Sequence, residues 1–458
     1  MQINKNDNVY VNLENGHKYA LYDVKKNENI IKYGYPIGHA TADIKKDERV
    51  HTNNLKTNLS GILSYSYNPD FPILESTEST IFKGYLRENG DAGIRNDVWI
   101  VNTVGCVNKT AEILAKRTGA FHFSHPFGCS QLGEDHKTTQ LILKGMVNHP
   151  NAGGVLVLGL GCENNNISEF KRILGDYNPD RVKFLNCQTS EDEISDGIRI
   201  ISELELYKEK FIRTDVSVSK LKVGLKCGGS DGLSGITANP LAGLFSDKLI
   251  SMGGTTVLTE VPEMFGAEGI LMNRCESEEI FNKTVNLIND FKEYYNRHNQ
   301  VIYENPSPGN KEGGITTLEE KSLGCTQKSG SGKVVDVLSY GDVVTKNGLN
   351  LLNGPGNDIV AVTNLMSAGC HMILFTTGRG TPVGSAVPTV KIATNKLLYE
   401  RKNSWIDFDA SSMLIEDKEL ILNKLTNLVT DVASGNIFTK NELNGYREIS
   451  IFKDGVVL

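Results

Sequence analysis

The chain has 458 residues, of which 39% are hydrophobic and 22% are charged. This length exceeds what one hydrophobic core organises, so two to four domains are expected. The net charge of −7 comes from interspersed acidic and basic residues, which predicts neither a nucleic-acid nor a membrane partner. Eight cysteines without a Cys-x-x-Cys pair, no spanning apolar stretch and no signal sequence predict a cytoplasmic protein with reduced thiols.

The beginning of the chain differs from the rest. In residues 1–63, short alternating segments separated by Gly, Asn and Asp turns predict a small β module. Residues 64–80 are polar, contain Pro69 and Pro72, and are interpreted as a linker. From residue 81 onward, strands, glycine-rich turns and helices alternate. This pattern predicts two α/β domains with mainly parallel, Rossmann-like sheets, at residues 81–215 and 216–458.

Six short apolar runs each end near a reactive or polar side chain. Runs of this kind are typical of buried parallel strands. Ligands bind outside the carboxyl ends of such strands, so the chain is expected to bring these groups to one edge of a sheet. The groups, in chain order, are Cys106, His125 with Cys129, Cys162 with Glu163, Cys227, Glu260 and Arg379.

Several of these groups are candidate metal ligands. Thiolates and an imidazole together select iron or zinc over magnesium. A buried cysteine is as often a small core residue, however, so only some of the set are expected to bind metal. The candidates are His125, Cys129, Cys162, Glu163 and Cys227, with Asp231 as a further possibility.

The segment from Cys227 to Pro240 is the densest motif. It is rich in glycine and hydroxyl groups and precedes a predicted helix at residues 241–252, for which Asn239 is the expected N-cap. A glycine-rich turn that enters a helix offers free N–H donors to a carboxylate or phosphate, although an ordinary turn is the alternative. Arg379, between two glycines, is expected to clamp a carboxylate. The expected substrate-binding residues are Ser230, Asp231, Ser234, Thr237, Lys328 and Arg379.

Nucleotide motifs are incomplete. Gly159-Leu-Gly161 lacks the third glycine of a dinucleotide fingerprint, Gly378-Arg-Gly380 has the wrong spacing, and no phosphate-binding P-loop occurs. A nicotinamide-dependent oxidoreductase is therefore a weaker alternative. A non-catalytic sugar-acid binder that uses the β module alone is a second alternative, which the reactive strand ends disfavour.

Longer motifs resemble the altronate and galactarate dehydratase family over essentially the whole chain. Gly16-His-Lys18 with residues 31–38 is similar to the SAF-type β-clip module that opens these enzymes. The altronate branch is the more similar one. The motifs that carry the resemblance are Asn89–Asn96, His125–His136, Gly159–Glu163, Cys227–Asp231, Thr259–Glu268, Pro306–Lys311, Gly324–Lys328, Thr377–Pro382 and Trp405–Ala410.

The resemblance implies a hydro-lyase that converts D-altronate into 2-dehydro-3-deoxy-D-gluconate in hexuronate breakdown, with Fe²⁺ or Mn²⁺. A galactarate dehydratase or a lyase acting on a sulfonated hydroxy acid is the alternative within the family. A homo-oligomer, preferably a dimer, is expected. Whether a single ion or an iron–sulfur cluster is bound stays open at this point.

Dehydration of a 2,3-dihydroxy acid needs a base at C2 and an acid at the departing C3 hydroxyl. The candidates for these two roles are His17, His51 and Glu260. Both histidines stand at turns of the β module, from which they are expected to reach a cleft of the neighbouring domain.

Overall fold

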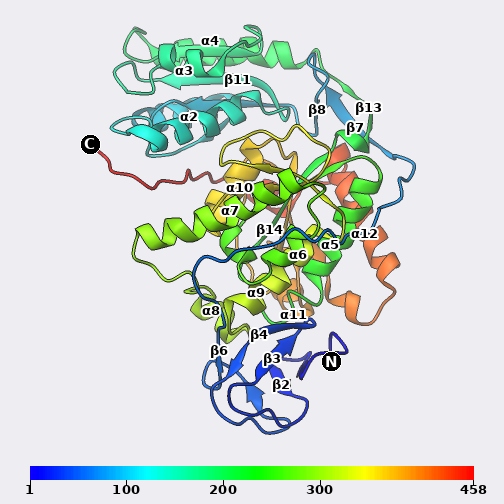
Figure 1. The fold of residues 1–458 in the computed structure, drawn as a ribbon. Coiled ribbons are helices and arrows are strands. Elements are labelled where there is room, and N and C mark those ends of the chain that lie inside the picture. The colour runs from blue at the N-terminus through cyan, green and yellow to red at the C-terminus, as the bar shows by residue number, and fades with distance from the viewer.

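The computed structural model describes residues 1–458. Three bodies follow one another along the chain: a small β module, a first α/β domain and a larger α/β domain. Figure 1 shows the larger domain in the middle, with the β module (blue) and the first α/β domain (cyan to green) at opposite ends of it. None of the helices has the length and apolar character that a membrane span requires.

The β module consists of two three-stranded antiparallel sheets, with the strand orders β1-β2-β5 and β3-β4-β6. Its strands are β1 (Val9–Val11), β2 (Lys18–Ala20), β3 (Asn29–Lys32), β4 (Tyr35–Ala40), β5 (Arg49–Val50) and β6 (Leu55–Lys56). Its core cluster has only 11 buried residues, and two of them, Ala267 and Leu323, come from the larger domain. The module therefore completes its core only by docking on that domain.

A buried ion triad attaches the β module to the larger domain. The Glu320 carboxylate accepts hydrogen bonds from Lys18 Nζ and Lys32 Nζ, each at 2.8 Å. Burial opposes the ionisation of Glu320, but the two ammonium groups outweigh it and lower the pKa of Glu320 to about 2. Close by, Gly232 packs so tightly on the module that a Cβ at this position would overlap Gly16 O. The turn that carries His17 is thus held against residues 228–237.

The first α/β domain has a four-stranded parallel sheet in the order β10-β9-β11-β12. Its elements are β9 (Asp97–Asn102), η1 (Gly105–Val107), α1 (Asn108–Thr118), β10 (Phe121–Phe123), α2 (Gly133–Asn148), β11 (Ala152–Gly159), α3 (Ile167–Leu174), β12 (Val182–Asn186) and α4 (Glu193–Lys208). The strands are apolar on both faces because α1 and α4 cover one face and α2 and α3 the other.

A small antiparallel sheet, ordered β13-β7-β8, brackets this domain. It contains β7 (Ile81–Leu86), β8 (Ala92–Gly93) and β13 (Arg213–Ser217). The chain enters the first α/β domain after β7 and β8 and leaves it through β13. Because β7 and β13 pair with each other, the two segments that connect the domains lie side by side. The predicted division at residues 63, 80 and 215 stays a prediction.

The larger domain has a seven-stranded parallel sheet in the order β16-β17-β15-β14-β18-β19-β20. The strands are β14 (Lys222–Cys227), β15 (Thr255–Leu258), β16 (Val334–Leu338), β17 (Gly348–Leu352), β18 (Met372–Thr377), β19 (Thr389–Ala393) and β20 (Phe408–Asp409). The helices are η2 (Val218–Lys220), α5 (Ala238–Ser251), η3 (Val261–Met264), α6 (Glu268–Met272), α7 (Glu278–Arg297), α8 (Pro308–Glu312), α9 (Leu318–Cys325), η4 (Thr326–Ser329), α10 (Asp358–Ser367), α11 (Lys396–Arg401), η5 (Ser411–Leu414), α12 (Lys418–Ser434) and α13 (Lys440–Asn444).

These sheets confirm the predicted fold class, which is α/β with two parallel sheets after a small β module. One predicted helix start is wrong. The N-cap of α5 is Thr237, and Asn239 lies inside the helix. Asn239 is buried there, because its amide donates to Gly324 O at 2.9 Å and accepts from Thr376 Oγ1 at 2.6 Å. These long-range partners, rather than a capping role, explain a buried asparagine at this position.

Candidate active site

Two thiols and a carboxylate meet at the carboxyl edge of the seven-stranded sheet. Cys227 ends β14, Glu263 lies in η3 directly after β15, and Cys325 ends α9. The two sulfur atoms are 3.3 Å apart, and Glu263 Oε2 lies 3.2 Å from Cys227 Sγ and 3.1 Å from Cys325 Sγ. All three side chains are buried and could hold one metal ion. We call these three residues the thiol cluster.

The surroundings of the thiol cluster are densely charged. Lys328 Nζ lies 2.8 Å from Cys227 Sγ and 3.1 Å from Glu260 Oε2. Three ammonium groups and three carboxylates balance one another here: Lys226, Lys321 and Lys328 with Glu260, Glu263 and Asp358. A divalent ion that displaced the protons of both thiols would keep this balance. The donor set therefore fits a divalent ion, and two sulfur donors favour iron over magnesium.

The acidic groups of the site have opposite pKa shifts. The hydrogen bond with Cys227, together with burial, raises the pKa of the Cys325 thiol well above its usual value. Burial and the neighbouring Glu263 raise the pKa of Glu260. Burial acts on Glu263 too, but Lys321 and the other lysines outweigh it and hold its pKa well below the usual range. One carboxylate is thus firmly ionised while its neighbour can accept a proton, which is typical of acid–base sites.

The loop after Cys227 is held by its own side chains. The Asp231 carboxylate accepts from Thr394 Oγ1 at 2.9 Å and from Ser234 Oγ at 3.0 Å, and burial raises its pKa. Thr237 Oγ1 donates to Thr394 O at 2.8 Å. Ser230 Oγ, in contrast, is buried without a hydrogen-bond partner. Of the four predicted loop residues, Ser230 is the one whose polar atom is free for a ligand.

A cavity of about 640 Å³ lies beside this loop, between the β module and the larger domain. Gly16, Asp231 and Arg379 line it, and the exposed Arg379 pairs with Glu312 at 2.9 Å. Its size is in the range of small-molecule sites. Three further basic side chains line it: Lys396, Arg401 and Lys402. With Arg379, four basic side chains line the cavity against three acidic ones, Glu14, Asp231 and Glu312. The cavity therefore carries a small excess of positive charge, which suits an anionic ligand.

Two of the three histidines of the β module, His17 and His51, face the larger domain. Their ring centroids are 5.8 Å apart, and His51 Nε2 lies 2.9 Å from Lys311 O. Arg49 Nη2 lies 3.0 Å from His17 Nδ1. Burial and the Arg49 charge lower the pKa of His17 to about 4, and burial also lowers the pKa of His51. Both rings are therefore neutral near pH 7 and able to accept a proton.

His125 and Glu163 stabilise the first α/β domain. His125 Nε2 lies 2.8 Å from Asn102 O, and its Nδ1 accepts from the Phe127 N–H. Glu163 accepts from Thr103 Oγ1 at 2.7 Å and from two main-chain N–H groups of its own turn. Since both side chains are buried and their polar atoms are engaged, neither offers a free donor atom to a metal in this structure.

The expected convergence of four strand-end cysteines is wrong. Cys106, Cys129 and Cys162 are exposed at the strand ends of the first α/β domain, whereas Cys227 is buried at the end of β14. The two parallel sheets are separate, so these strand ends do not form one edge. Cys227 therefore joins Glu263 and Cys325 instead of the other predicted metal ligands.

Sequence reasoning missed Glu263, Cys325 and Lys226 as site residues. Glu263 stands three positions after Glu260, and this short carboxylate pair was a usable signal. Cys325 stood in a motif used only for the resemblance. Lys226 is fully buried near the end of an apolar strand. A charged residue at such a position indicates a buried partner of opposite charge. Lys226 indeed donates to Glu260 and, at 2.9 Å, to Asp358.

Known protein families match all three parts of the chain. Residues 1–58 match the altronate/galactarate dehydratase SAF domain, residues 84–207 the D-galactarate dehydratase/altronate hydrolase second domain, and residues 218–457 the D-galactarate/altronate dehydratase C-terminal domain. The first match confirms the predicted SAF-like module. An altronate dehydratase of Bacillus subtilis is 55% identical over 97% of this chain and 92% of its own length.

Two relatives from Escherichia coli differ clearly in their sequence identity to this chain. An altronate dehydratase is 54% identical over 97% of this chain and 92% of its own length. A galactarate dehydratase (L-threo-forming) is 31% identical over 96% of this chain and 90% of its own length. The chain is thus far more similar to the first kind of enzyme than to the second.

Proposed function

The chain belongs to the altronate and galactarate dehydratase family of enzymes, and on this premise we propose that it dehydrates D-altronate. The product is 2-dehydro-3-deoxy-D-gluconate, an intermediate of hexuronate breakdown. The observation that carries the proposal is the identity of 55% and 54% to altronate dehydratases against 31% to a galactarate dehydratase. Dehydration of galactarate is the second candidate, because the cationic cavity would also accept a dianion.

We expect the purified protein to form 2-keto acid from D-altronate on the order of 10²-fold faster than from galactarate at equal concentration. Galactarate carries a second carboxylate at C6, whose desolvation a site built for a hydroxyl does not compensate, and it also differs from D-altronate in the configuration at C5. A colorimetric 2-keto-acid assay over a panel of aldonates and aldarates measures this ratio. Equal or faster turnover of galactarate would assign the chain to the other branch.

The reaction breaks the C2–H bond and the C3–O bond, and the resulting enol becomes the 2-keto acid. The C2 proton is weakly acidic because the adjacent carboxylate is already negative. We propose that Cys227, Glu263 and Cys325 hold Fe²⁺ or Mn²⁺, which when bound supplies Lewis-acid stabilisation of the developing negative charge. Lys328, within reach of both Cys227 and Glu260, adds a fixed positive charge to the same place.

Proton transfer is assigned to three groups. His17 and His51 are the candidates to accept the C2 proton, because both imidazoles are neutral near pH 7. The raised pKa of Glu260 suits a group that donates a proton to the departing C3 hydroxyl, which leaves as water. We assign the substrate carboxylate to Arg379, which lines the cavity, and a substrate hydroxyl to Ser230 Oγ, which has no hydrogen-bond partner.

His17→Ala is expected to lower kcat by about 10²-fold, as for loss of a general base. His39→Ala is the matched control, because His39 belongs to the same module and its ring is bonded only to Asn58. Since the pKa of His17 is lowered to about 4, its basic form persists down to that pH, and its contribution to kcat is lost as the pH falls through about 4. A pH–rate profile checks this limb. A His17→Ala variant as active as the His39→Ala control would exclude the role.

A further inference from the structure

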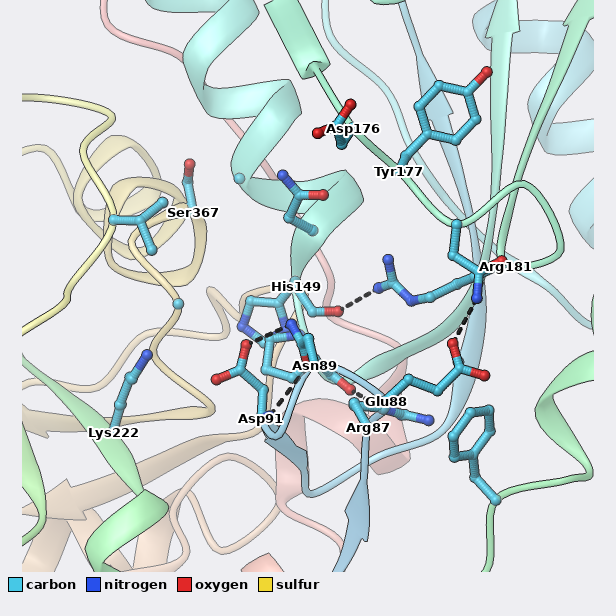
Figure 2. A pocket seen from close by; sticks show the side chains of 18 of the residues that line it. Arg87, Glu88, Asn89, Asp91, His149, Asp176, Tyr177, Arg181, Lys222 and Ser367 are labelled. Atoms are coloured by element: carbon cyan, nitrogen blue, oxygen red, sulfur yellow. Dashed lines mark hydrogen bonds between the residues drawn. The ribbon is translucent and has the colours of Figure 1, made fainter.

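A second cavity, of about 460 Å³, lies where the first α/β domain meets the larger one. Its walls come from the β7–β8 loop, the end of α2, the loop before β12 and the start of β14, and Figure 2 shows their side chains. Lys222 begins β14 and Cys227 ends it, so the cavity and the thiol cluster lie at opposite ends of one strand, about 16 Å apart. We call this cavity the interdomain pocket.

The inner wall of the interdomain pocket carries unpaired positive charge. Arg87 donates three hydrogen bonds, two to main-chain carbonyls and one to the side-chain oxygen of Asn96. Arg181 donates four hydrogen bonds, all to main-chain carbonyls. Lys222 Nζ donates only to Val344 O, at 3.3 Å. None of the three cations forms an ion pair, and each keeps at least one free N–H donor. A half-buried or buried cation without a counter-charge is costly, and an anion in the pocket would offset that cost.

The two guanidinium groups also act on each other. Burial and the charge of Arg181 lower the pKa of Arg87 to about 10, and burial lowers the pKa of Arg181. The guanidinium of Arg87 lies over the ring of Phe211, 5.2 Å from its centroid, so an aromatic face rather than a carboxylate covers it. The carboxylates of Asp91 and Glu88 act on Arg181 from the rim of the pocket, but neither forms an ion pair with a cation of the wall.

The rim of the interdomain pocket is acidic. Glu88 and Asp176 are exposed, and Asp91 is half-buried. Glu88 accepts from Asn178 at 2.6 Å and Asp91 from Asn89 at 2.9 Å, which leaves lone pairs on both carboxylates for hydroxyl donors. Solvent screens these exposed charges more than those of the wall, so they weaken but do not cancel the attraction for an anion. Only four of the 19 lining residues are hydrophobic, which disfavours an apolar ligand.

We propose that the interdomain pocket binds a small polyhydroxylated anion. Its negative group lies against Arg87, Arg181 and Lys222, and its hydroxyl groups donate to Glu88 and Asp91. Because the walls belong to two domains, such a ligand stabilises their contact by binding only the assembled form. The proposal requires neither the metal nor turnover of altronate.

Isothermal titration of the full chain with D-gluconate tests the proposal, with sulfate as an anion without hydroxyls and sorbitol as hydroxyls without charge. We expect gluconate to bind at least about tenfold tighter than either probe, because only gluconate satisfies wall and rim together. Lys222→Met is expected to weaken this binding about tenfold, as for one lost charge-assisted contact. Lys220→Met, the same change at an exposed neighbour outside the pocket, is expected to leave it unchanged.

Asn148→Trp provides a second variant that fills the interdomain pocket from an exposed lining position, and it is expected to abolish this binding. If gluconate binds equally well to wild type, Lys222→Met and Asn148→Trp, its site lies elsewhere and the proposal is overturned. Sulfate or sorbitol binding as tightly as gluconate would overturn the ligand class. A failure to turn over altronate would contradict the proposed function but leave these titrations unaffected, so the two proposals fail separately.

Discussion

Cys227→Ala and Cys325→Ala are each expected to lower both iron affinity and the rate of 2-keto-acid formation by at least about 10²-fold. Each change removes one of three donor atoms from the thiol cluster. Cys227→Ala also leaves Lys328 without the sulfur that lies 2.8 Å from its Nζ, so the charge balance of the site changes as well. Iron content after anaerobic reconstitution and the keto-acid assay measure the two effects. Removal of the ion by a chelator and return of Fe²⁺ should abolish and restore activity in the wild type.

Cys370→Ala is the matched control for both thiol variants. Cys370 is equally buried, but its side chain belongs to the apolar core beneath α10. Its replacement is expected to cost about 1 kcal/mol of stability and to leave iron binding unchanged. If Cys227→Ala and Cys325→Ala retain iron and activity as Cys370→Ala does, the two thiols are core residues and the metal site lies elsewhere.

Glu320→Gln is expected to destabilise the docking of the β module by about 3–5 kcal/mol. The substitution leaves Lys18 and Lys32 buried without a counter-charge, where the carboxylate now pairs with both at 2.8 Å. Since the module completes its small core on the larger domain, we expect it to detach and activity to fall with it. A lower Tm and faster proteolytic cleavage in the linker would report the detachment.

Asp23→Asn serves as the control for Glu320→Gln. Asp23 pairs with Lys45 at 3.0 Å within the same module, but both side chains are more than half exposed, so its replacement is expected to change the stability little. The pKa of Glu320 is lowered to about 2, so its stabilisation is complete above about pH 4.5 and is lost as the pH falls toward 2. Equal Tm values for the two variants would contradict the role of the triad.

Local sequence pattern was sufficient for the elements of the fold. The apolar runs around Val98, Val155, Val223 and Met372 form β9, β11, β14 and β18, because a short run without polar residues is buried on both faces only between two helical layers. The resemblance of Gly16-His-Lys18 and its flanking strands likewise identified the SAF-like module. Both signals lie within a few neighbouring residues, so they can be read from the sequence without knowledge of the tertiary structure.

Which strand ends meet was decided only by tertiary structure. The apolar runs of the two sheets look alike in sequence, so nothing local separated Cys162 from Cys227. His125 and Glu163 have the residue types of metal ligands, yet their partners are mainly main-chain groups that no residue type reveals. Cys325 reaches Cys227 from 98 positions away because α9 packs against the edge of the sheet. Contacts over such separations depend on how helices and sheets pack, which the spacing of residues along the chain does not encode.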